Sequence, residues 1–289
     1  MKFKDNKKSI YISLDGGLGN QLFQFAMAFS LSKKLNMKLI LDISHYTKKN
    51  IRKFELYKFK YIKKSFILHR KRSYFFRKFI KIYNFFFLET YNEKNPFLYD
   101  AKISNLPKSR NIYIAGYFQS EKYFSDKRLE ILNLLKFNNY FNKKFLALQK
   151  DIKNTASVAI HVRRGDYLNS STRAVHGVLN LIYYEKCISF ILHKVKKPRF
   201  FIFSDDIEWV KSNNFFSKLK NSLVVDTKSN HKDLELMSLC KYFIVANSSF
   251  SWWGAWLSTS KNKIVCAPKK WLNIKFDYSD LLPKKWKTF

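Results

Sequence analysis

The stretch IYISLDGGLGNQLFQFAMAFSLSKKLNMKLILDIS, residues Ile10–Ser44, has the pattern that decides the fold. It opens on the β-rich run IYISLD, which GGLGN interrupts before apolar residues at Leu22, Phe25 and Phe29 recur at helical spacing. The apolar run KLILDIS then follows the expected helix. Strand, helix and strand in this order make a βαβ unit, which predicts a parallel sheet.

The second half of the chain repeats this alternation. VAIHV at Val158–Val162 predicts a buried strand, and helical and strand-like segments alternate from there to the end of the chain. We therefore expect a doubly wound α/β domain at 151–289 and a first α/β domain at 1–150. The further strands are expected at 199–204, 222–226, 242–248 and 263–268, with helices at 183–197 and 231–241.

The net charge of +34 over 289 residues is extreme and favours an anionic partner: nucleic acid, an acidic membrane surface or a phosphorylated substrate. Abundant Lys, Asn, Ile and Phe leave compositional drift as an alternative origin. The excess of basic over acidic residues is densest in the segment at about 46–110, where aromatic residues alternate with the basic ones. That segment is either an interfacial segment that binds anionic membranes or a solvated face over an aromatic core.

Three features bear on location. The cysteines, Cys187, Cys240 and Cys266, are odd in number and show no Cys-x-x-Cys spacing, as expected of buried thiols in a reducing cytosol. No run approaches the ~18 apolar residues of a membrane span. The basic start lacks an apolar secretory segment. We expect a cytoplasmic protein, with peripheral binding at the inner face of the membrane as an open alternative.

The unusual polar residues cluster at the expected carboxyl ends of strands, where open parallel sheets bind their ligands. Because these residues all follow strands, we expect them to lie on one rim, formed by the carboxyl ends of the strands. A single rim predicts one cleft that residues from both halves of the chain face. The residues are Arg163, Arg164, Asp166, Asp205, Asp206, Asp226, Ser248, Ser249 and Ser251, with Gly16, Gly17, Gly19 and Asn20 after the first strand.

The types of residue on this rim suit a phosphate. NSSFS precedes a helical turn, so hydroxyl and backbone N–H groups converge there, although Ser248 or Ser249 could equally be an ordinary helix N-cap. Arg163 and Arg164 carry planar forks that match phosphate oxygens. Since neighbouring strand residues point to opposite faces, we expect Arg163 to face the ligand and Arg164 to brace the loop.

Other chemistries lack their signatures. The glycines of GGLGN have neither the spacing of a dinucleotide-binding fingerprint nor that of a P-loop. The segment is therefore either a place where a ligand comes close to the backbone or a plain tight turn between strand and helix. No His/Cys cluster has zinc spacing, SDD contains no Asp-x-Asp pair, and Asp206 is as readily a helix cap. No nucleophile–base triad and no RNA- or DNA-binding motif is present. Nucleic acid is therefore not an expected partner.

Four motifs together resemble the α-1,2-fucosyltransferases of glycosyltransferase family 11. They are GGLGNQLFQFA, HVRRGDY, FSDD and NSSFSWWGAWL, at 16–26, 161–167, 203–206 and 247–257, and they span nearly the whole chain. The resemblance implies a GT-B-like fold of two facing Rossmann-like domains. It also implies GDP-β-L-fucose as donor, inverting transfer to the 2-hydroxyl of a galactoside, and no obligatory metal or other cofactor.

The resemblance further implies roles for single residues. Arg163 would bind the pyrophosphate and stabilise the departing GDP, with Arg164 beside it. Asp166, the carboxylate nearest these arginines, is either the general base or a brace that orients them. The remaining implied donor contacts are His161 at the guanosine end, Asp226 at the base or ribose, Ser248, Ser249 and Phe250 around the phosphate and nucleoside, and Gly19 and Asn20 from the other domain.

We accordingly expect an acceptor-side domain at 1–150 and a GDP-fucose-binding domain at 151–289. The expected acceptor is a galactose-terminated oligosaccharide, lipid-linked if the enzyme builds a bacterial surface glycan such as lipopolysaccharide O-antigen. Two alternatives stay open: a related GDP-sugar transferase with another acceptor linkage, and a basic nucleic-acid-binding protein.

Overall fold

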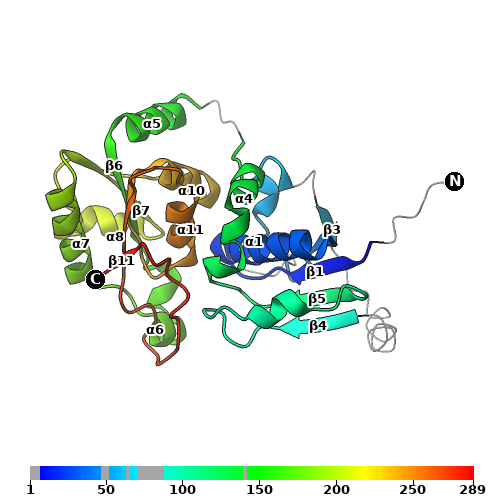
Figure 1. Ribbon diagram of the computed structural model, residues 1–289. Helices are drawn as coiled ribbons and strands as arrows, with labels where there is room; N and C mark the ends of the chain where they lie inside the picture. The colour runs from blue at the N-terminus through cyan, green and yellow to red at the C-terminus, as the bar shows by residue number, and fades with distance from the viewer. Residues whose placement is uncertain (1–6, 47–51, 63–65, 70–87, 139–141) are drawn as a thin grey trace. The chain divides into compact units, whose positions relative to one another are not determined.

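The computed structural model describes residues 7–46, 52–62, 66–69, 88–138 and 142–289 (Figure 1). The contacts divide the chain into two compact units, Met1–Asn138 with Asp277–Leu281, and Asn139–Phe276 with Leu282–Phe289. The division thus falls before helix α5 (Lys143–Asn154) and not after residue 150, because α5 packs against strand β6 (Ala156–Val162) and helix α10 (Asn230–Leu239) of the second unit.

The first unit contains, within its described residues, a five-stranded sheet in the order β3-β2-β1-β5-β4, with every pairing parallel. The predicted βαβ unit at its centre is confirmed. Helix α1 crosses from β1 to β2, and Figure 1 shows it packed along the sheet. The elements are β1 (Ser9–Ser13), α1 (Leu18–Leu35), β2 (Lys38–Asp42), β3 (Ile67–His69), β4 (Leu88–Asn92), β5 (Asn111–Ala115) and α4 (Arg128–Leu134).

Local sequence sets both ends of α1. Gly16 has φ +78°, a left-handed conformation that glycine adopts without a Cβ penalty, and Gly17 is the N-cap. At the other end Asn36 is the left-handed C-cap at φ 56°, and Lys33 in the last turn complements the helix dipole. GGLGN is therefore, at the least, a tight turn that leads into the helix.

The second unit contains a six-stranded parallel sheet over its described residues, in the order β11-β10-β9-β6-β7-β8. This confirms the predicted α/β architecture with parallel sheets in both halves. The strands are β6, β7 (Pro198–Ser204), β8 (Ser222–Val224), β9 (Tyr242–Ile244), β10 (Ile264–Ala267) and β11 (Lys287–Thr288). The helices are α5, α6 (Ser170–His176), α7 (Leu181–Lys194), α8 (Ile207–Ser212), α9 (Asn214–Ser217), α10 and α11 (Ser249–Leu257).

The core of the second unit fixes which way β6 faces. Val158, Ile160 and Val162 pack with Tyr184 and Ile188 of α7 in one apolar cluster. The alternate residues of the strand, among them His161, therefore point to the opposite face of the sheet. Strand β6 lies between β9 and β7, so its carboxyl end is central in the sheet.

Part of the predicted basic insertion at 46–110 falls on residues 47–51, 63–65 and 70–87, which lie outside the described residues. Strand β4 lies in this insertion and was not predicted, nor were α5 and α6. Among the described residues, no helix combines the length and the apolar character that crossing a membrane requires.

Candidate functional site

The carboxyl ends of β8, β7, β6 and β9 are consecutive at one edge of the second sheet. Because all four strands are parallel, the residues that follow them share this edge, as the sequence predicted. Asp226 follows β8, Asp205 follows β7, Arg163 follows β6, and Ser248 lies between β9 and α11.

Arg163 is held by two carboxylates. The register pairs Val162 of β6 with Ser204 of β7, so the next residue of each strand, Arg163 and Asp205, also lie side by side. Nη1 of Arg163 lies 2.9 Å from Oδ2 of Asp205, and Nη2 donates to Oδ1 of Asp166 at 2.5 Å. The guanidinium carbon lies 5.1 Å from the centre of the Tyr167 ring. The side chain is therefore fixed before any ligand binds.

Arg164 makes a different set of contacts. Its Nε donates to Oδ2 of Asp206 at 3.1 Å, and its guanidinium carbon lies 3.7 Å from the centre of the Trp209 ring. Its backbone N–H donates to Oδ1 of Asp205 at 2.9 Å. These contacts tie the loop to β7 and α8 and support the expected bracing role. Asp206 also accepts from the backbone N–H of Trp209, which confirms the helix-cap interpretation of that residue.

Gly165 permits this close packing. A Cβ built on it would lie 2.4 Å from Oδ2 of Asp205, a separation that real side chains do not show. Any larger residue would displace the carboxylate that holds Arg163. The glycine of HVRRGDY thus lets the Asp205 side chain approach the backbone of the loop closely.

His161 is buried with 4% of its surface exposed, and its ring centre lies 5.6 Å from that of Phe250 at the start of α11. Burial, and then the charge of Arg163, lower the pKa of His161 to about 3. The imidazole is therefore neutral at physiological pH. It can hydrogen-bond a ligand but supplies no charge.

Three residues of the site were not predicted to act together. The Tyr167 ring stacks on His176 of α6, with centres 4.9 Å apart and planes at 13°. The Tyr167 hydroxyl donates to the carbonyl of Asn247 at 3.0 Å, and Nδ2 of Asn247 donates to the carbonyl of His176 at 2.8 Å. No periodicity marks α6, so sequence reasoning had no signal for His176.

Unmet hydrogen-bonding capacity gathers at this edge. Five of the eight buried side-chain atoms without a hydrogen-bond partner in the described part of the chain lie here. A buried polar atom without a partner costs about 1–3 kcal/mol, and native proteins retain few, so their gathering here supports this edge as the candidate ligand site. The five are Nδ1 of His161, Nε of Arg163, Nδ1 of His176, Oδ1 of Asp226 and Oδ1 of Asn247.

Serine hydroxyl groups form hydrogen bonds with the backbone at the start of α11. Ser248 is the N-cap and accepts from the backbone N–H of Phe250 at 3.4 Å, which confirms the capping interpretation. The buried Ser251 hydroxyl donates to the carbonyl of Ala246 at 3.3 Å. Ser249 opens the helix and is half-buried. The helix start brings its positive dipole end to the edge that holds Arg163.

Asp226 follows β8, the strand at the edge of the second sheet. Its Oδ2 is 2.9 Å from Nζ of Lys228, and this contact lowers the pKa of the Asp226 carboxyl. The carboxylate is therefore ionised, and it is suited to accept hydrogen bonds from a hydroxyl or an amino group. The nearby Asp233 is bound by the Thr227 hydroxyl at 2.7 Å and so belongs to the support of this loop.

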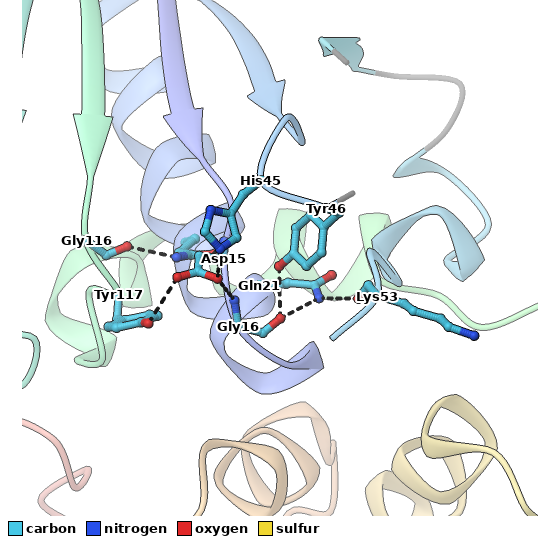
Figure 2. A network of polar contacts seen from close by, with 9 residues as sticks. Asp15, Gly16, Gln21, His45, Tyr46, Lys53, Gly116 and Tyr117 are labelled. Carbon is cyan, nitrogen blue, oxygen red and sulfur yellow. Dashed lines mark hydrogen bonds and ion pairs between the residues drawn. The ribbon is translucent and has the colours of Figure 1, made fainter. Parts of the chain in front are cut away.

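In the first unit, Gly19 is buried in the first turn of α1, and Asn20 accepts from Nε2 of Gln119 at 3.2 Å. Their expected approach to a donor stays a prediction. The same end of this sheet also carries an unpredicted polar network around Asp15, drawn in Figure 2.

Known proteins resemble this chain over nearly its whole length. The model of the family described as Glycosyl transferase family 11 matches residues 1–288. The chain is 34% identical over 281 residues to an alpha-1,2-colitosyltransferase of Escherichia coli, covering 94% of this chain and 96% of that one. It is 33% identical over 287 residues to the O-antigen biosynthesis glycosyltransferase WbnK of Escherichia coli, covering 91% and 94%.

Among solved structures, the NodZ alpha-1,6-fucosyltransferase soaked with GDP-fucose matches with a TM-score of 0.53 and 14% identity, over 87% of this chain and 93% of that one. At this identity the likeness bears on fold alone. Together with the two parallel sheets, it confirms the predicted GT-B-like fold class.

Proposed function

The chain belongs to glycosyl transferase family 11, and on that premise we propose that it moves L-fucose from GDP-β-L-fucose to the 2-hydroxyl of a galactoside, with inversion. The observation that carries the proposal is the fixed position of Arg163 between Asp166 and Asp205 at the end of a central strand. Inverting transfer breaks the bond between the anomeric carbon and the diphosphate, and the departing GDP gains negative charge. Donors already in place stabilise that charge without reorganisation.

The two carboxylates beside Arg163 determine how this side chain would stabilise the departing diphosphate. Two carboxylates flank one guanidinium, so the group contributes directed N–H donors rather than net positive charge. The dipole of α11 adds a favourable field at the same edge. Arg163 and the first turn of α11 together would bind the two phosphates.

The nucleoside would lie against His161 and Phe250. A neutral buried imidazole beside an aromatic ring offers hydrogen bonding and a stacking surface, which suits a guanosine. Asp226, Ser248 and Ser249 would complete the contacts, and Arg164 would hold the loop. The first unit would carry the acceptor, with Gly19 and Asn20 approaching the donor.

A second donor has specific support. The relative with 34% identity is named an alpha-1,2-colitosyltransferase. Colitose is the 3-deoxy form of L-fucose, so the two sugars differ by one hydroxyl. A transferase of this family therefore has two reasonable GDP-sugar donors to test. The second relative is named an O-antigen biosynthesis glycosyltransferase, which supports an O-antigen precursor as the acceptor class. We take that precursor to be galactose-terminated and lipid-linked.

Three further expectations belong to the proposal. Transfer needs no metal or other cofactor, so EDTA should leave turnover unchanged. The enzyme works in the cytoplasm, with binding to an anionic membrane surface as its peripheral attachment. Co-sedimentation with anionic and with neutral vesicles at moderate salt tests that attachment, and equal binding to both would contradict it.

The deciding experiment is turnover of GDP-fucose and GDP-colitose against a panel of β-galactosides, with the product linkage determined by NMR. We expect an α-1,2-linked product from one of the two donors. No transfer from either donor, or a product linked at another hydroxyl, would contradict the proposal. Retention of GDP but not of an oligonucleotide on the protein separates the enzyme from a nucleic-acid-binding protein.

A further inference from the structure

Tyr167, His176 and Asn247 form a closed circuit of contacts at the edge that holds Arg163. The Tyr167 hydroxyl donates to the carbonyl of Asn247 at 3.0 Å, and the Tyr167 ring stacks on the His176 ring with centres 4.9 Å apart. Nδ2 of Asn247 donates to the carbonyl of His176 at 2.8 Å, which closes the circuit. Tyr167 and Asn247 are buried, and all three residues belong to the second unit.

The three residues come from three segments that meet only in the folded unit. Tyr167 lies in the loop after β6, His176 is the last residue of α6, and Asn247 lies between β9 and α11. The register pairs Ile160 of β6 with Ile244 of β9, so the segments that lead to Tyr167 and to Asn247 leave the sheet side by side. The circuit therefore ties the loop after β6 to the start of α11.

Each end of the circuit is next to a group that would bind a phosphate. The guanidinium carbon of Arg163 lies 5.1 Å from the centre of the Tyr167 ring. Ser248, the N-cap of α11, directly follows Asn247. Arg163 and the first turn of α11 are the groups that would hold the two phosphates of GDP under the proposed function. Because the circuit connects them, it fixes how far apart these two phosphate-binding groups lie.

The circuit is held together at a cost in stability. Nδ1 of His176 and Oδ1 of Asn247 are buried without a hydrogen-bond partner in the described part of the chain. Burial lowers the pKa of His176 below its ordinary value, so the ring stacks as a neutral imidazole. Apolar groups of the same shape would remove the cost of the unmet atoms. Their retention favours a functional reason for the circuit over a purely structural one.

We propose that Tyr167, His176 and Asn247 are positioning residues that set the spacing between Arg163 and the start of α11 to the span of a diphosphate. The proposal rests on the proposed function and deepens it, because it names the feature of the donor that this spacing recognises. Tyr167 acts through Arg163, Asn247 acts through the helix start, and His176 fixes the plane of the Tyr167 ring. A diphosphate uses both groups at once, whereas a monophosphate uses one group and gains nothing from the spacing.

The Kd for GMP divided by the Kd for GDP measures the proposed role, and titration calorimetry gives both constants. Tyr167→Phe removes the hydroxyl that reaches Asn247 and keeps the ring that stacks on His176. We expect its Kd for GDP to rise about three- to tenfold, the range that loss of one hydrogen bond covers, while its Kd for GMP changes less than about twofold. The ratio should therefore fall.

Tyr183→Phe is the matched control. The Tyr183 hydroxyl donates to the carbonyl of Val245 at 2.6 Å, in the same segment after β9, and Tyr183 is 7% exposed against 8% for Tyr167. Each variant loses a buried tyrosine hydroxyl that binds a backbone carbonyl of this segment, so both should lose similar stability. The ratio should nevertheless keep its wild-type value in Tyr183→Phe.

His176 supplies a second, independent pair of variants. His176→Ala removes the stacked ring, whereas His176→Phe keeps a ring and removes the unmet Nδ1. We expect the ratio to fall in His176→Ala and to return to near the wild-type value in His176→Phe. His176 is half-buried, so neither variant disturbs the apolar core of the unit.

A wild-type ratio in both Tyr167→Phe and His176→Ala would overturn the proposal, as would an equal fall in Tyr183→Phe. A wild-type protein that binds GDP no more tightly than GMP would also overturn it, since no diphosphate spacing is then recognised. Failure of the proposed function is a separate result: the ratios would change as expected, yet the wild-type protein would transfer sugar from neither GDP-fucose nor GDP-colitose. That outcome would contradict the transfer and leave the role of the circuit in diphosphate binding confirmed.

Discussion

Nη1 of Arg163 lies 2.9 Å from Oδ2 of Asp205, so a side chain after β6 is held by a side chain after β7. The two residues are 42 positions apart in the chain, and the parallel register of the strands brings them together. Since Asp166 holds the same guanidinium from within the loop, Arg163 is braced from two sides. The arrangement accounts for the arginine, the glycine and the aspartate of HVRRGDY at once.

Arg163→Ala should lower kcat about 10²- to 10³-fold, as loss of one preorganised donor to a developing negative charge does. Arg163→Lys should restore little, because an ammonium lacks the planar fork that meets two carboxylates and a phosphate. Steady-state kinetics on the folded variants make the measurement. Arg199→Ala is the matched control, since Arg199 also pairs with an aspartate but at the start of β7. Equal losses in Arg163→Ala and Arg199→Ala would contradict the assignment.

Asp166→Asn distinguishes the two roles left open for that carboxylate. Its contact with Nη2 of Arg163 favours the brace, so we expect weaker GDP binding, by about tenfold, with the acidic limb of the pH–rate profile kept. Titration calorimetry with GDP and a pH series of kcat give the two readouts. Unchanged GDP affinity together with a lost acidic limb would instead identify Asp166 as the base.

Gly165→Ala should cost about 1–3 kcal/mol of unfolding free energy, because the added Cβ meets Asp205 and the loop must shift. GDP affinity should fall with it, since the same carboxylate positions Arg163. Gly17→Ala is the control: a Cβ there meets nothing within 4 Å, and the cost should stay below about 1 kcal/mol. Denaturant unfolding of both variants measures the difference, and equal destabilisation would refute the packing argument.

His161 should make stability depend on pH in acid. Its folded-state pKa is lowered to about 3 from an ordinary 6.5, so between these values the unfolded chain binds the proton and the folded chain does not. Unfolding free energy should therefore fall as pH drops from 6.5 towards 3. The destabilisation caused by His161→Gln should be largest above pH 6.5 and shrink in acid. A constant difference between variant and wild type across this range would contradict the shift.

Glu93 should make the unfolding free energy fall as pH rises, which is the opposite of the dependence expected for His161. Burial raises its folded-state pKa to about 7 from an ordinary 4.5, despite the backbone N–H groups of Tyr117 and Phe118 that bind it. Between these two pH values Glu93 is protonated in the folded chain and ionised in the unfolded chain. The stability that protonated Glu93 contributes is therefore lost as pH rises from 4.5 to 7. Glu93→Gln, which cannot ionise, should gain stability relative to wild type over this interval. Parallel unfolding curves at pH 5 and pH 8 provide the test.

Much of the fold could be predicted from local pattern. The period-2 and period-3.6 runs around GGLGN and after VAIHV located β1, α1, β2 and the strands β6 to β10 of the second sheet, because each element buries one face of its own sequence. Strand β11 was not predicted. The amphipathic helix α5 was missed, although Phe145 and Ile152 lie on its buried face. Part of the basic insertion lies outside the described residues, so its role stays a prediction.

The sequence by itself determined the two α/β halves and, within each half, the edge at which the strands end, since alternation along the chain is enough to imply parallel strands that end together. Only the tertiary structure decided which side chains meet there. The pairing of Arg163 with Asp205, the stack of Tyr167 on His176 and the bond from Tyr117 to Asp15 depend on strand register and loop packing. Tyr117 and Asp15 are 102 positions apart, and no local periodicity encodes a contact at that separation.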